Sequence, residues 1–184
     1  MKPKYDIPSS MVIYMAEVFA TAAHGAIDQR RKYTGAPYIM HPEAVARIVQ
    51  SVESHTVQMV CAAWLHDVLE DTQCQTPELD RFFGYEVTTM VYRLTDVGPD
   101  YGNRAARKAY DRQRLAESSA EVQTIKIADL IDNTATIVKF DPKFAKVYIR
   151  EKRELLDVLD DADRGLWQRA YNQLVAAELE LVKA

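Results

Sequence analysis

The segment that most constrains this chain is residues 60–72, VCAAWLHDVLEDT, an apolar run that turns acidic within two helical turns. On a helix with about 100° per residue, His66, Asp67, Glu70 and Asp71 share an arc of roughly 140°. The remaining positions are apolar almost all round, which is typical of a helix surrounded by neighbours. Charged groups there are costly unless they are paired or bound to a metal. Either the last turn simply reaches solvent, or other parts of the chain hold these acids.

The length and charge of the chain limit the remaining interpretations. With 184 residues, 48% hydrophobic and 27% charged, residues 1–184 are predicted to form a single globular domain. The net charge of −4 gives no general attraction for nucleic acid or an anionic membrane. Residues 1–10 lack the apolar stretch of a signal peptide, so we expect a soluble cytoplasmic protein. Cys61 and Cys74 have no CxxC spacing, which argues against a disulfide or a zinc knuckle.

Helical periodicity and capping residues predict an all-α fold, a helical bundle of about eight to ten helices. Ser9 or Ser10, Thr56, Thr76 and Asp141 are the expected N-caps, and Gly84 is expected to end a helix. The expected helices cover about residues 9–29, 42–52, 57–72, 76–84, 86–94, 104–114, 120–138, 142–159 and 164–184. No segment shows the strict alternation of a strand.

A second polar stripe runs along the expected helix 120–138. Asp129, Asn133, Thr136, Lys126 and Asp132 lie on one side, and the opposite arc is filled with Ile, Leu, Val and Ala. An ordinary amphipathic surface helix would also give such a stripe. Asp, Asn and Thr are nevertheless poor helix formers compared with Glu and Lys, so their choice favours a lined site.

The loop 30–42, RRKYTGAPYIMHP, begins with three cations and contains two tyrosines. Arg31 and Lys32 could simply complement the end of the preceding helix, or they could bind phosphate and stack on a nucleobase. His41 stands at the entry of the next helix, where the backbone can aim a ligand. His24 is interpreted as a surface or supporting histidine. The loop 95–103 is expected to form one wall of a pocket, next to a basic helix whose cations are mostly solvated.

A metal site follows if His41, His66, Asp67 and Asp129 converge. Two imidazoles and two carboxylates form a mixed N/O donor set, not a thiolate site, and such a set suits Mn²⁺, Fe²⁺ or Zn²⁺. Such an ion would acidify a bound water and polarise a phosphoryl oxygen, as phosphoester hydrolysis requires. Glu70 and Asp71 would then be left to orient the water or move its protons.

Taken together, these residues resemble the HD superfamily of metal-dependent phosphohydrolases. The surrounding segments are similar to the hydrolase domain of RelA/SpoT-type alarmone enzymes, and the chain most resembles a stand-alone small alarmone hydrolase. The segments that carry this resemblance are RKYTGAPYIMHP (31–42), LHDVLEDT (65–72), FG (83–84), LT (94–95) and KIAD (126–129), with Asn133 after them.

The resemblance implies roles for individual residues. One Mn²⁺ is expected on His41, His66, Asp67 and Asp129, with Glu70 and Asp71 as the catalytic pair. The expected nucleotide contacts are Arg31, Lys32, Asn133, Thr136 and Tyr148. The implied reaction removes pyrophosphate from the 3′ position of a purine nucleotide, guanosine or adenosine 3′,5′-bis(diphosphate) in class. The partner is thus a small-molecule nucleotide, and the oligomeric state is left open.

The chain departs from the usual pattern of that family after Asp129. Leu130, Thr134 and Ala135 replace residues that are commonly basic, Met/Leu or Arg, and Asp132 replaces an aromatic residue or His. These changes affect how a polyanion would be held. Two alternatives therefore stay open: an HD nucleotidase that acts at a 5′ phosphate or on NADPH, and a catalytically silent domain that binds an alarmone.

Overall fold

The computed structural model describes residues 8–183, and within them the predicted all-α fold is confirmed. The residues of this range form nine α-helices, one short 3-10 helix and no strand. The helices are α1 (Ser9–Ala26), α2 (Met40–Gln50), α3 (Val57–Leu65), α4 (Val68–Asp71), α5 (Thr76–Leu94), η1 (Pro99–Tyr101), α6 (Arg104–Ala116), α7 (Ala120–Phe140), α8 (Pro142–Leu156) and α9 (Arg164–Lys183).

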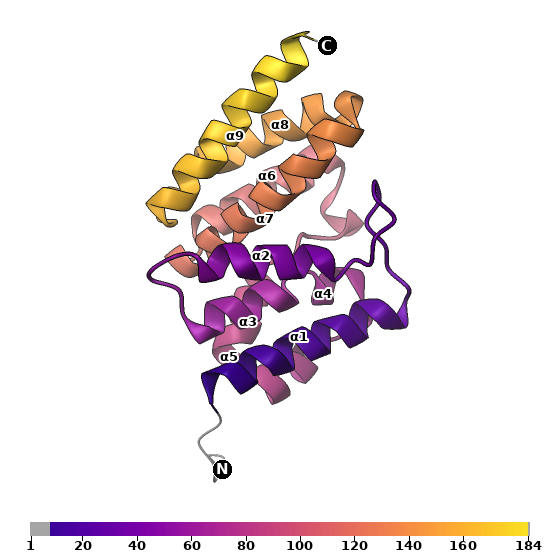
Figure 1. Ribbon diagram of the computed structural model, residues 1–184, viewed down its shortest axis with the longest axis vertical. Helices are drawn as coiled ribbons and strands as arrows, with labels where there is room; N and C mark the ends of the chain where they lie inside the picture. Colours follow the sequence, from indigo (N-terminus) through magenta and orange to yellow (C-terminus); the bar gives the residue numbers. More distant parts are fainter. Residues whose placement is uncertain (1–7, 184) are drawn as a thin grey trace.

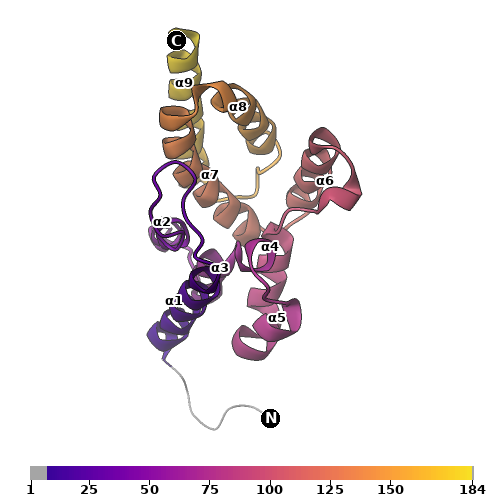
Figure 2. The ribbon, with the colours of Figure 1, turned by 90° about the vertical axis from the view of Figure 1, so that its right-hand side faces the viewer.

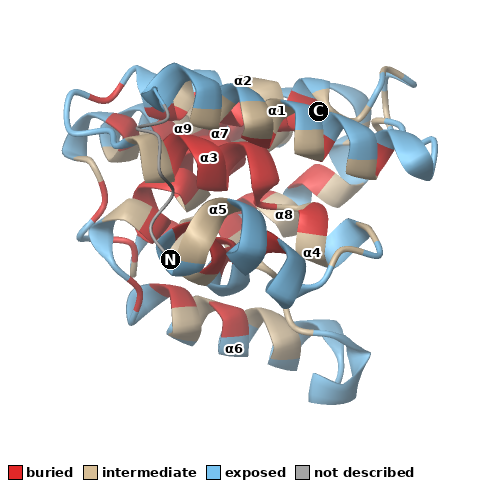
Figure 3. Ribbon diagram, turned by 90° about the horizontal axis from the view of Figure 1, so that it is seen from below, coloured by how far each residue is buried: buried red, intermediate tan, exposed pale blue. Residues whose placement is uncertain are grey.

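Helix α3 lies at the centre of one half of the bundle. It packs against α1, α2 and α5, and more lightly against α7 (Figure 1). All of its residues from Met59 to Leu65 are buried, because every face of this short apolar helix meets a neighbour (Figure 3). The prediction that the apolar run is surrounded is therefore confirmed.

Helices α7, α8 and α9 form the other half, and α7 joins the halves by packing against α2. Figure 2 shows α6 on the opposite side of α7 from α2. The contacts of α6 with α5, α7 and α8 are sparse. No helix among residues 8–183 combines the length and the apolar character that a membrane span needs.

Capping explains several of the boundaries. Thr56 accepts a hydrogen bond from Met59 N at 3.1 Å, and Asp141 accepts one from Phe144 N at 3.1 Å, as predicted. Gly84 interrupts α5 with φ 80° and ψ 169°, so two helical segments meet at the glycine that the sequence marked.

Several sequence predictions about boundaries are wrong. The N-cap of α1 is Pro8 rather than Ser9 or Ser10, and the helix ends at Ala26, before Asp28 adopts a φ of 47°. Residues 57–72 are not one helix, because the chain turns at His66 and Asp67 between α3 and α4. At this turn His66 Nδ1 bonds to Ala63 O at 2.8 Å. The side chains of His66 and Asp67 both point inward and lie 3.1 Å apart. The expected helix of residues 142–159 ends at Leu156, and the N-cap of α5 is Gln75 instead of Thr76.

Candidate metal centre and nucleotide pocket

Three elements bring the four predicted metal ligands together. His41 lies in the first turn of α2, His66 and Asp67 form the turn after α3, and Asp129 lies in the middle of α7. Ligand atoms of His41, His66 and Asp129 all lie within 4.8 Å of one another. His41 Nε2 lies 3.2 Å from His66 Nε2 and 3.2 Å from Asp129 Oδ1. Asp67 Oδ2 lies 3.1 Å from His66 Nε2 and 3.6 Å from His41 Nε2.

The hydrogen bond made by Nδ1 of each histidine determines whether its Nε2 atom, which faces the centre, carries a lone pair in the neutral ring. His66 Nδ1 lies 2.8 Å from the carbonyl oxygen of Ala63, and His41 Nδ1 lies 2.7 Å from Asp132 Oδ2. Both partners only accept hydrogen bonds, so both Nδ1 atoms donate. In the neutral rings each Nε2 then presents a lone pair to the centre, which is the form that binds a metal.

The ionised carboxylates of the centre favour a positive charge between them, either a proton on histidine or a bound cation. Burial opposes protonation of His41, but hydrogen bonds to Asp129 and Asp132 outweigh it and raise its pKa to about 9. Burial would also raise the pKa of Asp129, yet the charge of Lys126 keeps that pKa well below its ordinary value. Two carboxylates and two inward lone pairs thus fit a divalent cation, which would replace protons here. The mixed N/O donor set suits a transition metal such as Mn²⁺, Fe²⁺ or Zn²⁺.

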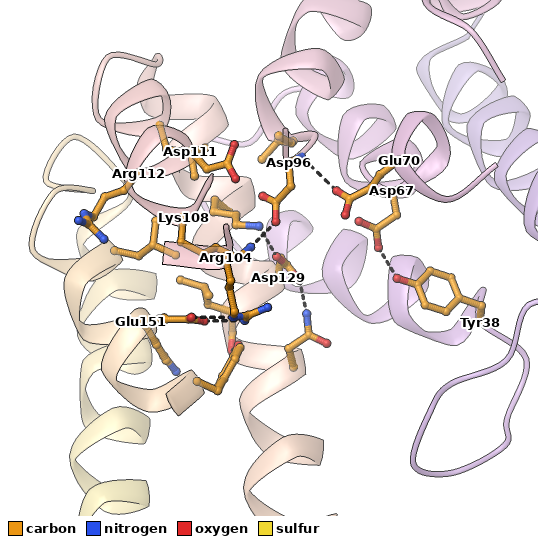
Figure 4. Close-up of a pocket in the computed structure, with 18 residues that line it drawn as sticks. Tyr38, Asp67, Glu70, Asp96, Arg104, Lys108, Asp111, Arg112, Asp129 and Glu151 are labelled. Atoms are coloured by element: carbon orange, nitrogen blue, oxygen red, sulfur yellow. Dashed lines mark hydrogen bonds and ion pairs between the residues drawn. The ribbon is translucent and has the colours of Figure 1, made fainter. Parts of the chain in front are cut away.

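Neighbouring side chains hold the ligands in place. Tyr38 donates its hydroxyl hydrogen to Asp67 Oδ2 at 2.6 Å. Lys126 Nζ lies 2.9 Å from Asp129 Oδ2, and Asn133 Nδ2 donates to Asp129 Oδ1 at 2.5 Å. Every carboxylate of the centre therefore has a donor that fixes its orientation (Figure 4).

Glu70 and Asp71 occupy different places although they are adjacent in sequence. Glu70 lines the same cavity as Asp67 and Asp129, and it accepts a hydrogen bond from Asp96 N at 3.0 Å. Burial, together with the charge of Asp96, raises the pKa of Glu70 to about 7. Asp71 is exposed and accepts a hydrogen bond from Gln29 Nε2 at 2.8 Å. Glu70 thus faces the cavity, whereas Asp71 is held from the side of α1.

The cavity beside the metal centre is lined by cations from α6. Arg104, Lys108 and Arg112 all contribute to its wall (Figure 4). Each is paired with an acid: Lys108 with Asp96, Arg104 with Glu151 at 2.8 Å, and Arg112 with Glu154 at 2.5 Å. Part of the basic helix therefore lines the cavity, although the side chain of Arg104 is still 48% exposed. Asp96 of the loop 95–103 lines this cavity as well.

A second cavity adjoins the first and contains most of the predicted nucleotide contacts. Arg31, Lys32, Thr136 and Phe144 line it, and it shares Asn133 and Tyr38 with the cavity of the metal centre. Tyr148 lines the first cavity, where its hydroxyl lies 3.5 Å from Leu130 O. The five residues predicted to contact a nucleotide thus line two adjoining cavities.

Residues around the loop 30–42 support the site in ways that the sequence does not indicate. Gln29 precedes this loop and Tyr38 lies within it, and Tyr38 N donates to Gln29 O at 3.0 Å. His24 is buried and bonds to Gln29 Oε1 through Nδ1 at 2.7 Å, which fits the supporting role and not the surface one. Lys126 could have been found from its position one turn before Asp129, since residues three apart on a helix are neighbours.

Comparison with known proteins identifies relatives over most of the chain. The model of a family described as "HD domain" matches residues 16–151. A guanosine-3′,5′-bis(diphosphate) 3′-pyrophosphohydrolase of Aquifex aeolicus is 34% identical over 160 residues, which are 84% of this chain and 22% of that protein. The mouse guanosine-3′,5′-bis(diphosphate) 3′-pyrophosphohydrolase MESH1 is 34% identical over 123 residues, 66% of this chain and 68% of that protein.

The chain spans about a fifth of the length of its bacterial relatives from Synechocystis and Aquifex. A solved structure described as a metazoan ortholog of SpoT that hydrolyses ppGpp has the same fold. It superposes with a TM-score of 0.81 at 24% identity and covers 95% of this chain and 98% of that one.

Proposed function

Because this chain belongs to the HD domain family, we propose that it is a metal-dependent 3′-pyrophosphohydrolase of alarmone-type purine nucleotides. The proposed substrates are of the guanosine or adenosine 3′,5′-bis(diphosphate) class, and the proposed metal is Mn²⁺. Residues 1–184 act in this proposal as a single HD-type domain.

One observation carries the proposal: a two-histidine, two-carboxylate centre opens into a cavity with Glu70 at its edge and cations on its wall. The names of the Aquifex and mouse relatives supply the substrate class. A cation-lined cavity suits a polyanionic nucleotide, since Arg and Lys are the residues that recognise phosphate.

In the proposed reaction, water adds to the phosphorus that is bonded to the 3′ oxygen. The bond between this phosphorus and the 3′ oxygen breaks, which yields pyrophosphate and a 3′-hydroxyl. A divalent cation held by His41, His66, Asp67 and Asp129 would supply Lewis acidity and lower the pKa of a bound water. Glu70 takes a proton from the attacking water, and Asp71 assists in orienting that water. The proton then passes to the leaving 3′ oxygen, which gives the 3′-hydroxyl. Arg31, Lys32, Asn133, Thr136 and Tyr148 bind the nucleotide along the two cavities.

Ion pairs and hydrogen bonds from the surrounding residues support the proposed roles of the metal ligands and of the phosphate-binding cations. Lys126 balances the charge of Asp129, and Tyr38 keeps Asp67 in one orientation. The cations of α6 can exchange their acidic partners for phosphate oxygens, because Lys108 and Arg104 already line the cavity. Side chains that are already oriented in the free enzyme lower the activation barrier, because little of their reorganisation is left for the reaction itself.

The test is a product assay. Purified protein with Mn²⁺ is incubated with guanosine 3′,5′-bis(diphosphate), its adenosine counterpart and NADPH, and the products are separated by chromatography. Release of pyrophosphate from either of the first two supports the proposal. Orthophosphate from NADPH would support a nucleotidase instead, and nucleotide binding without product would indicate a silent sensor.

Two variants make the assay specific. Asp67→Ala is expected to abolish both metal binding and turnover, whereas Glu70→Ala is expected to retain the metal and lose turnover. Turnover that survives the loss of Asp67 would refute the assignment of the centre.

A further inference from the structure

One oxygen of Asp132 accepts hydrogen bonds from two functional regions. His41 Nδ1 lies 2.7 Å from Asp132 Oδ2, and Arg31 Nη2 lies 2.9 Å from the same atom. The side chains are 1% exposed for His41, 13% for Arg31 and 22% for Asp132, so water competes little for these bonds. Asp132 lies on α7 one turn after Asp129, and one helix therefore carries both a candidate ligand and this acceptor.

The bond to His41 makes the two histidines of the centre unequal. His66 donates to a neutral carbonyl, that of Ala63, whereas His41 donates to a carboxylate. A carboxylate behind an imidazole fixes the ring orientation, selects the tautomer with a free Nε2 and increases the basicity of that nitrogen. His41 is therefore the better oriented and stronger donor of the two.

The bond to Arg31 fixes a cation at the wall of the second cavity. The Arg31 guanidinium also donates to Thr136 Oγ1, at 3.3 Å, so it is held between two residues of α7. A charge-assisted bond of this kind limits the rotamers of a long side chain. The guanidinium thus faces the nucleotide cavity in one orientation before any ligand binds.

We propose that Asp132 is a positioning residue that aims His41 at the metal and Arg31 at the nucleotide. The nucleotide half of this inference rests on the proposed function, whereas the metal half rests only on the geometry of the centre. Asp132 also occupies a position at which the resemblance to alarmone hydrolases implies an aromatic residue or His, so that resemblance does not supply this role.

The metal half is tested with the Asp132→Asn variant, which keeps the size of the side chain and removes its charge. Mn²⁺ is titrated calorimetrically into the metal-free full chain. The affinity is expected to fall about 10- to 100-fold, as for other partners of metal-bound histidines. Glu178→Gln is the matched control, because it removes the carboxylate that pairs with Arg153 at 2.6 Å between α8 and α9. Its Mn²⁺ affinity should equal that of the wild type.

A second measurement covers the case in which Asp132→Asn fails to fold. NMR of the wild type loaded with diamagnetic Zn²⁺ is expected to show a proton on His41 Nδ1. A proton-free Nδ1, or a folded Asp132→Asn variant with wild-type Mn²⁺ affinity, would overturn the inference, as would a wild type that binds no divalent metal.

The nucleotide half is tested by binding of guanosine 3′,5′-bis(diphosphate) in the presence of a chelator, where no turnover occurs. Arg31→Met should weaken binding in the wild type and weaken it clearly less in the Asp132→Asn background. Equal losses in both backgrounds would contradict the role of Asp132 toward Arg31. If the wild type binds Mn²⁺ but no nucleotide, the proposed function fails and the metal half is still decided by the titration.

Discussion

His41 Nε2 and His66 Nε2 lie 3.2 Å apart, although both rings use their protonated Nδ1 atoms elsewhere. Asp67 and Asp129 place negative charge around these two nitrogens, and the pKa of His41 is raised to about 9, so a proton occupies the metal-free centre near neutral pH. A divalent cation would replace this proton and balance more of the carboxylate charge. Metal binding is therefore expected to add to the stability of the fold.

Metal binding should consequently stabilise the fold. At a Mn²⁺ concentration about 100-fold above the dissociation constant, we expect the melting temperature to rise by about 5 to 10 °C. Differential scanning calorimetry with Mn²⁺ and with chelator measures this. A melting temperature that does not respond to Mn²⁺ would argue against a preformed site.

Removal of the Glu70 carboxylate should separate chemistry from metal binding. Glu70→Gln is expected to lower kcat about 100-fold, the usual contribution of a positioned base, and to leave Mn²⁺ affinity near that of the wild type. Steady-state kinetics and calorimetry test the two parts. A large loss of metal affinity would instead make Glu70 a ligand.

The raised pKa of Glu70 predicts the direction of the pH dependence. Burial and the charge of Asp96 raise this pKa to about 7, so Glu70 is protonated and inactive as a base at lower pH. A bound cation would act in the opposite direction and lower this pKa, so kcat is expected to rise with pH and level off at or below about pH 7. The residual activity of Glu70→Gln should lack this limb. If kcat of Glu70→Gln rises with pH as in the wild type, the titrating group is a residue other than Glu70.

Gln29 is predicted to position Asp71. Its amide bonds to His24 on one side and donates to Asp71 on the other, at 2.7 and 2.8 Å. Gln29→Leu should lower kcat about tenfold without changing Mn²⁺ affinity, because the loose carboxylate samples unproductive orientations.

The control for Gln29 is Gln113→Leu, which also removes an amide–carboxylate bond, that to Glu117 at 3.1 Å on the surface of α6. In an Asp71→Asn background, Gln29→Leu should cost little more. Losses that simply multiply in the double variant would show that Gln29 acts independently of Asp71.

Lys152 should make stability depend on pH. Its side chain is fully buried, with Nζ 2.9 Å from both Thr134 Oγ1 and Gln173 Oε1, and burial lowers its pKa from 10.5 to about 7. Between these two values the unfolded chain binds more protons than the folded one, so stability rises with pH.

Relative to Lys152→Met, the wild type should gain about 2 kcal/mol in the free energy of unfolding between pH 7 and pH 9. Urea unfolding at both pH values measures this difference. Lys146→Met, at an exposed position of α8, should show no such change. A gain of the same size relative to Lys146→Met would place the titrating group elsewhere.

Local signals predicted much of the fold. The caps at Thr56 and Asp141 and the break at Gly84 are properties of short segments, and they hold in the structure. The break between α3 and α4 has no such signal, since residues 60–72 contain neither Gly nor Pro. It depends on His66 and Asp67 turning toward α2 and α7, which only the tertiary structure defines.

The sequence predicted the metal ligands of the site but not the contacts that hold them. Residue types and spacing indicated His41, His66, Asp67 and Asp129 as one group, and these side chains do lie together. The partner of Asp132 could not be predicted, because His41 is 91 residues away and a helical wheel gives only a direction. No local signal in the sequence distinguishes Lys152 from the other cations of α8, yet its side chain is fully buried.

The most direct test of the account is a calorimetric titration of the metal-free chain with Mn²⁺, carried out in parallel for wild type and Asp129→Ala. We expect the wild type to bind one ion per chain and Asp129→Ala to bind none over the same range, because Asp129 is the only candidate ligand that α7 contributes within the described residues. Unchanged binding in Asp129→Ala, or no binding in the wild type, would contradict the convergence of these four side chains on one ion.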